Sequence, residues 1–172
     1  AGNTALVIGD PKVSEGWSQL EGARAEATAV QQVLEQGGYK VNALIDKDFM
    51  AVISALHNSP YKIMHFAGHG DVDLVDPKNS GMILDNNIRI TPSEVAQLDY
   101  IPELVFVNCC FLGSTQQVKV QWNQLAANLG TQFINIGVKC VVAAGWAVND
   151  AAAEEFAKTF YDMMVNGFEF GE

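Results

Sequence analysis

The sequence predicts an α/β fold, a doubly wound and mainly parallel sheet flanked by helices, with a small β-hairpin insert. Strand-like and helix-like segments alternate along the 172 residues, which is typical of parallel strands joined by crossover helices. Several strand-like runs are apolar throughout instead of alternating, as expected of strands that are covered on both faces. The two clearest runs, 62–67 and 103–110, lead directly into residues with chemical function.

The composition describes one domain. With 49% hydrophobic and 17% charged residues, the chain is long enough to bury a substantial core and is neither disordered nor membrane-spanning. A net charge of -10 argues against a nucleic-acid surface, which needs clustered Lys and Arg. Three cysteines without zinc or disulfide-framework spacing predict reduced thiols in the cytoplasm. We expect residues 1–172 to form a single domain of a longer protein, with no metal, cofactor, membrane or nucleic-acid partner.

The first part of the chain predicts strands and helices in regular alternation. In order, these are a strand at 4–9, a helix at 21–36 that ends at Gly37-Gly38, a strand at 40–45, a short helix capped by Asp48, and the strand that leads to His69.

The second part begins with the hairpin, whose strands are 82–84 and 88–90. A helix starts at Thr91-Pro92-Ser93-Glu94, where the capping residue, the N1 proline and the N3 glutamate are in place. Next come a strand that ends at Cys110, a mobile loop from Phe111 to Gln121, a helix at 123–137, a fully buried strand at 139–145, and a helix at 150–166.

A histidine and two cysteines follow two of the buried strands. In doubly wound sheets the carboxyl ends of the strands face the ligand crevice, so His69 and a neighbouring thiol could act as base and nucleophile. Cys109 and Cys110 are consecutive, and their side chains leave opposite faces of the strand. Only one of them can serve, and we expect the other to be a small buried hydrophobe.

The remaining candidates have simpler interpretations. We expect His65 to be a core histidine or to support the site from behind, His57 to lie on the surface, and Cys140 to be structural. Gly68 and Gly70 flank His69, where a thin backbone would let a ligand approach closely. No Gly-x-Ser-x-Gly elbow and no glycine-rich phosphate loop occurs.

Two of these segments resemble known motifs. The run 104–113 (LVFVNCCFLG) is similar to the cysteine signature of CHAT domains, which are caspase-like cysteine peptidases of clan CD, related to separase, caspases and gingipains. The run 64–70 (MHFAGHG) resembles their histidine motif. The resemblance spans nearly the whole chain, and further counterparts lie at 9–11, 20–26, 81–84 and 146–150. It departs from the family at Phe111-Leu112, where a polar pair is usual, and at Asn108-Cys109, where Ser-Ala is usual.

This resemblance implies a cysteine endopeptidase that cleaves a protein substrate through a thioester. It makes Cys110 the nucleophile, His69 the base, and the backbone N-H groups of Gly70 and Cys110 the oxyanion donors. Asp150, Trp146 and, more weakly, Asp10 become candidates for the S1 pocket, which would favour a basic P1 residue; Asp150 could equally be a plain helix N-cap. The implied setting is a bacterial defence or signalling system in the cytoplasm, with a protein or peptide substrate and with tetratricopeptide-repeat or other regulatory domains or an activating complex as partners.

Two alternatives remain open from the sequence. The same fold could be a catalytically silent interaction module within a larger complex. It could also be another thiol enzyme of a doubly wound fold, such as an amidotransferase, whose nucleophile sits on an elbow before a helix. The predicted loop from Phe111 to Gln121 disfavours such an elbow because it has no helix start.

Overall fold

The structure is a computed structural model of the chain. It describes residues 2–58, 60–71, 73, 75–111, 116–147 and 151–167. For residues 77, 110, 111, 116–119, 121, 146 and 147 it describes the backbone alone.

A parallel sheet forms the centre of the molecule, with the strand order β2-β1-β3-β6-β7. The strands are β1 (Thr4–Gly9), β2 (Lys40–Ile45), β3 (Ile63–Asp71), β6 (Leu104–Phe111) and β7 (Cys140–Ala147). β3 and β6 lie side by side in the middle and are covered on both faces, which explains why their sequences are apolar without alternation. The predicted α/β fold with a mainly parallel sheet is confirmed.

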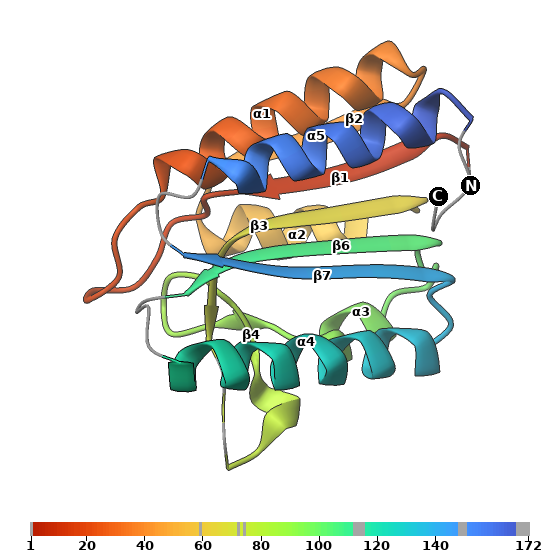
Figure 1. The fold of residues 1–172 in the computed structure, drawn as a ribbon. Helices are drawn as coiled ribbons and strands as arrows, with labels where there is room; N and C mark the ends of the chain where they lie inside the picture. Colours follow the sequence, from red (N-terminus) through yellow and green to blue (C-terminus); the bar gives the residue numbers. More distant parts are fainter. Residues whose placement is uncertain are drawn as a thin grey trace.

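Helices cover both faces of this sheet (Figure 1). One face carries α1 (Glu21–Gln36) and α5 (Ala152–Val165), and the other carries α2 (Phe49–Asn58), α3 (Pro92–Ala96) and α4 (Gln116–Asn135). Each layer has its own cluster of buried apolar side chains against the strands. In the described part of the chain, no helix is both long and apolar enough to cross a membrane.

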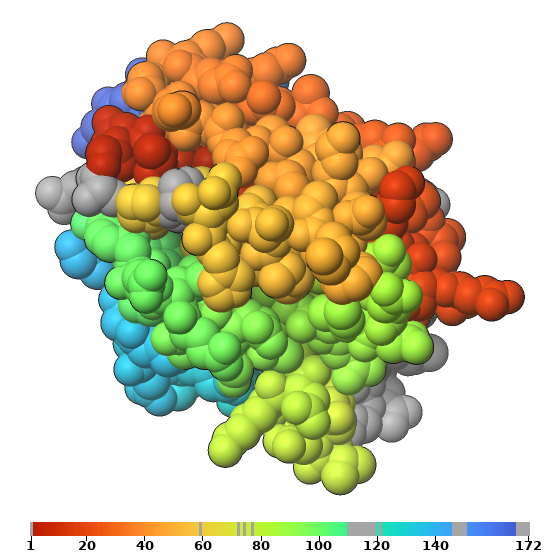
Figure 2. Space-filling model, turned by 180° about the vertical axis from the view of Figure 1, so that it is seen from behind, coloured from red at the N-terminus to blue at the C-terminus, as the bar shows by residue number. Residues whose placement is uncertain are grey.

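The predicted hairpin insert is present. β4 (Gly81–Ile83) pairs antiparallel with the end of β3 and with β5 (Arg89–Ile90). Its turn holds Asn86 and Asn87 at φ 53° and 56°, a conformation that asparagine tolerates better than most residues. The short helix η1 (Pro77–Asn79) precedes the hairpin, and this part of the chain projects from the body of the molecule (Figures 1 and 2).

Three local predictions were wrong. The mobile loop expected from Phe111 to Gln121 is largely absent, since β6 includes Phe111 and α4 already begins at Gln116; residues 112–115 lie outside the described part. In the part of α4 whose side chains are described, Trp122, Leu125, Leu129 and Phe133 are buried, and Val120 in the missed stretch is exposed. The strand at 139–145 was predicted to be fully buried, but residues 141–145 of β7 are half-buried because β7 lies at the edge of the described sheet. The helix cap predicted at Thr91 is also missing, since Thr91 makes no side-chain capping hydrogen bond.

Candidate active site

The carboxyl ends of β3, β6 and β7 carry three predicted site residues in one row. His69 pairs in register with Cys110, and Cys110 pairs with Trp146. Adjacent strands lie about 4.8 Å apart, so the backbones of His69 and Cys110 are direct neighbours. The side chains of Cys110 and Trp146 lie outside the described part, and their roles stay predictions.

Cys109 belongs to the core. Its side chain is 2% exposed and packs in the apolar cluster that includes Trp122 of α4. This agrees with the expectation that one of the two adjacent cysteines is a small buried hydrophobe. Cys109 therefore faces α4, on the side of the sheet away from α1 and α5.

The glycines beside His69 make room for side chains of the core, and their predicted role in letting a ligand approach the backbone stays a prediction. A Cβ added to Gly70 would lie 2.8 Å from Cys109 Cβ and 3.0 Å from Trp122 Cζ3. One added to Gly68 would lie 3.1 Å from the sulfur of Met82. Glycine at positions 68 and 70 leaves space for Met82 and Trp122 to pack against the end of β3.

The imidazole of His69 is held by the loop between β1 and α1. The ring is 1% exposed, and its Nε2 lies 2.6 Å from the backbone carbonyl oxygen of Ser18. A carbonyl can only accept, so Nε2 carries the hydrogen and Nδ1 of the neutral ring carries the lone pair. The indole of Trp17 packs against the ring at a centroid distance of 5.0 Å. Within the described residues Nδ1 is buried and has no hydrogen-bond partner.

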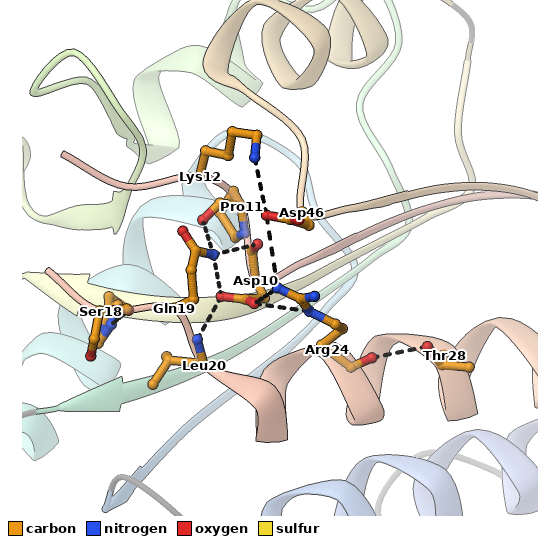
Figure 3. Close-up of polar contacts among 10 residues, drawn as sticks. Asp10, Pro11, Lys12, Ser18, Gln19, Leu20, Arg24, Thr28 and Asp46 are labelled. Atoms are coloured by element: carbon orange, nitrogen blue, oxygen red, sulfur yellow. Dashed lines mark hydrogen bonds and ion pairs between the residues drawn. The ribbon is translucent and has the colours of Figure 1, made fainter.

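Asp10 organises the same loop (Figure 3). Its carboxylate is 2% exposed; Oδ1 accepts from the backbone N-H of Leu20 at 2.7 Å and from the Gln19 amide at 2.9 Å. Oδ2 accepts from Nη2 and Nε of Arg24 at 2.8 and 3.1 Å. The hydrogen bond to Asp10 is the main reason why the pKa of Arg24 is raised above its usual value. Both carboxylate oxygens are thus already engaged, and the S1 role of Asp10 stays a prediction.

A second polar cluster is buried behind the row, between the sheet and helices α1 and α5. Glu26 Oε1 accepts from His65 Nε2 at 2.7 Å, and Oε2 accepts from the Asn108 amide at 3.0 Å. With Nε2 donating, Nδ1 of His65 accepts from the hydroxyl of Tyr161 at 2.9 Å. Burial, and then the charge of Glu26, raise the pKa of Tyr161 well above its usual value. His65 is completely buried, as expected, and His57 is exposed.

The remaining predicted site groups are the side chain of Asp150 and the backbone N-H groups of Gly70 and Cys110. Asp150 lies outside the described part, so neither its pocket role nor its capping role is tested. Gly70 pairs with Met82 of the hairpin, and the backbone of Cys110 lies between β3 and β7. The oxyanion role of these two N-H groups stays a prediction.

Two groups in the site were missed by sequence reasoning. The Ser18 carbonyl is a backbone atom in an irregular loop, and no residue type marks it. Glu26 did leave a signal, because it falls between Ala23 and Ala27 on the buried stripe of α1, where an unpaired carboxylate would be unfavourable. A charged residue on that stripe calls for a buried partner, which is His65.

Comparison with known families decides the classification. The CHAT domain family profile matches residues 1–171. The chain belongs to the CHAT domain family. This CHAT domain is therefore a member of the caspase-like peptidase group that the motifs of β3 and β6 resemble. A search of curated proteins found no match.

Two solved structures are similar to this CHAT domain at low sequence identity. A flavodoxin from Streptococcus pneumonia TIGR4 is 12% identical with a TM-score of 0.54, over 96% of this chain and 99% of the flavodoxin. An NAD(P)H:quinone oxidoreductase from Methanothermobacter marburgensis is 11% identical with a TM-score of 0.49, over 100% of both chains. The first likeness shows the doubly wound fold alone, and the second is too weak to support an argument.

Proposed function

We propose that this CHAT domain is a cysteine endopeptidase with a His69–Cys110 dyad. The observation that carries the proposal is the register that pairs these two residues at the carboxyl ends of adjacent central strands. Family membership supports the same chemistry. The ring of His69 adds to it, because the Ser18 carbonyl leaves Nδ1 as the nitrogen that can accept a proton.

The proposed reaction is acyl transfer in two stages. Nδ1 of His69 takes the thiol proton of Cys110 while the sulfur bonds to the carbonyl carbon of the scissile peptide. The amine leaves with the proton from His69, and a thioester remains. Water, deprotonated by His69, then attacks the thioester, and the acid and the free thiol are released. Backbone N-H groups of Gly70 and Cys110 would hold the oxyanion, and each such donor is typically worth about 10² to 10³ in rate.

In this proposal the thiol of Cys110 faces His69. Successive side chains of a strand leave opposite faces, and Cys109 takes the α4 face. The face that remains for the next residue is the one where His69 contacts Trp17 and Ser18. This alternation favours Cys110 over Cys109 as the nucleophile independently of the family motif.

We propose a protein substrate with a basic P1 residue, with Asp150, Trp146 and Asp10 as the S1 candidates. The cytoplasm of a bacterium is the proposed setting, where regulatory domains or a complex activate the peptidase as part of a defence or signalling system. The net charge of -10 is compatible with a basic partner.

Cleavage of a peptide library, read by mass spectrometry, tests the proposal. Wild-type protein and Cys109→Ala should cleave, whereas Cys110→Ala and His69→Ala should not. Cys109→Ala is the matched control because it removes the adjacent thiol from the opposite face of the same strand. If wild-type protein cleaves nothing even when its activating partners are present, the domain is a silent interaction module. Equal cleavage by Cys110→Ala and wild type would reject the dyad.

A further inference from the structure

His69 receives its contacts from a loop that has no regular secondary structure of its own. The loop between β1 and α1 contributes the Ser18 carbonyl to Nε2 and the Trp17 indole to the ring face. The position of the imidazole therefore depends on what holds this loop in place.

The two residues that follow Ser18 are both bound to one carboxylate. Leu20 donates its backbone N-H and Gln19 its side-chain amide to Oδ1 of Asp10, at 2.7 and 2.9 Å. Arg24, one turn into α1, donates to Oδ2 through two nitrogens (Figure 3). Asp10 thus ties the end of the loop to the start of the helix.

Asp10 is itself bound to the strand that carries the histidine. Its backbone N-H donates to the carbonyl of Ala67, two residues before His69 on β3, at 2.9 Å. These contacts form a continuous path that leaves β3 at Ala67, passes through Asp10, Leu20 and Ser18, and returns to β3 at His69. Asp10 also has φ of 46°, a conformation that non-glycine residues adopt only when surrounding contacts hold it.

We infer that Asp10 is a positioning residue for His69, acting through Leu20, Gln19 and the Ser18 carbonyl, with Arg24 fixing its second oxygen. The inference rests on the proposed dyad. By fixing the Ser18 carbonyl, Asp10 keeps the hydrogen on Nε2 and the lone pair on Nδ1, and it places an acceptor where the imidazolium formed during proton transfer needs one. This role differs from the S1 role of Asp10, since it predicts a change in proton transfer and none in P1 preference.

The pH dependence of thiol alkylation tests this role. Alkylation of Cys110 by iodoacetamide is followed by intact mass between pH 5 and 10 in the wild type, Asp10→Ala, Asp10→Asn and His69→Ala. A dyad keeps the thiol reactive below the pKa of a free cysteine, about 8.5. We expect Asp10→Ala to alkylate about 10- to 10²-fold more slowly at pH 7 and to approach the profile of His69→Ala. Asp10→Asn retains an acceptor for the Leu20 N-H, and its alkylation rate should lie between those of the wild type and Asp10→Ala.

The matched control is Asp46→Asn. Asp46 is a second carboxylate close to Arg24, with Oδ1 3.8 Å from Nη2, and its substitution leaves the contacts of Gln19 and Leu20 in place. It should keep the wild-type profile. If Asp10→Ala fails to fold, Asp10→Asn decides. A folded Asp10 variant with the wild-type alkylation profile would overturn the inference.

A second readout separates this inference from the proposed function. Long-range ¹H–¹⁵N NMR reports which nitrogen of His69 is protonated, whether or not the protein is a peptidase. We expect one tautomer, protonated at Nε2, in the wild type and a mixture in the Asp10 variants. If wild-type alkylation does not depend on His69, the dyad fails, and the NMR result still decides the positioning role. An unchanged tautomer in folded Asp10→Ala rejects that role.

Discussion

Replacing Glu26 by alanine should be strongly destabilising, since this carboxylate is the acceptor of the buried cluster. Glu26 is 3% exposed and His65 is fully buried. Without the carboxylate, His65 Nε2 and the Asn108 amide lose the acceptors that lie 2.7 and 3.0 Å away.

The magnitude follows from the two donors. A buried donor without a partner costs about 1–3 kcal/mol, so two of them lower the free energy of unfolding by about 2–6 kcal/mol. Typical domains have only about 5–15 kcal/mol in total. Glu26→Gln keeps one acceptor oxygen but turns an amide N-H₂ toward the other donor, and we expect about half of the loss.

Urea denaturation followed by tryptophan fluorescence measures this change. With a typical m-value of about 2 kcal/mol/M, Glu26→Ala should lower the midpoint by about 1–3 M. The control is Glu35→Ala on the same helix, because the Glu35 side chain is exposed and accepts a surface hydrogen bond from Gln31. This substitution should change the free energy of unfolding by no more than about 0.5 kcal/mol. Equal, small shifts for both variants would refute the account of the cluster.

Three further predictions concern the rest of the fold and the site. Burial raises the pKa of Tyr161, so above about pH 10 the unfolded chain loses a proton that the folded protein keeps. The free energy of unfolding should therefore fall by about 1.4 kcal/mol per pH unit above that pH. Urea midpoints measured between about pH 9 and 11 should show this decrease in the wild type and lack it in Tyr161→Phe. Gly145→Ala would place a Cβ 1.8 Å from Trp122 Nε1 and should lower thermal stability by about 1–3 kcal/mol, whereas Gly130→Ala, with open space in α4, should stabilise by up to about 1 kcal/mol. Asp150→Asn should lower kcat/KM for substrates with Lys or Arg at P1 relative to those with a neutral P1; an unchanged ratio removes Asp150 from the pocket.

The sequence was most informative where burial dictates residue type. The apolar runs that became β3 and β6 predicted the central strands and placed His69 and Cys110 at their carboxyl ends, and the register pairs those two residues. The consecutive cysteines also predicted one buried thiol, which Cys109 is.

The sequence was least informative where backbone atoms and tertiary neighbours decide. The Ser18 carbonyl orients His69 through a group that every residue has, so no pattern could identify it. The start of α4 was missed because Gln116, Gln117 and Lys119 dilute the apolar pattern there, and Val120 is exposed. The sequence predicted a fully buried β7 because its residues are apolar. An apolar run indicates that helices cover the strand, but it does not indicate whether a further strand lies beside it.

The start of α4 at Gln116 bears on an amidotransferase-like elbow. A helix does follow Cys110, but it begins only at Gln116, and β6 continues through Phe111. An elbow requires the nucleophile to sit in the turn between strand and helix. Since Cys110 is paired on both sides within β6, the backbone argues against an elbow more directly than the predicted loop did.

In the proposed reaction Cys110 is the nucleophile and His69 is its base. Labelling with a peptidyl electrophile, read by intact mass, tests it most directly, because the adduct forms only where a thiol and a bound peptide meet. We predict one adduct on wild-type protein and on Cys109→Ala, none on Cys110→Ala, and slow labelling of His69→Ala. An adduct that persists in Cys110→Ala and disappears in Cys109→Ala would contradict the assignment.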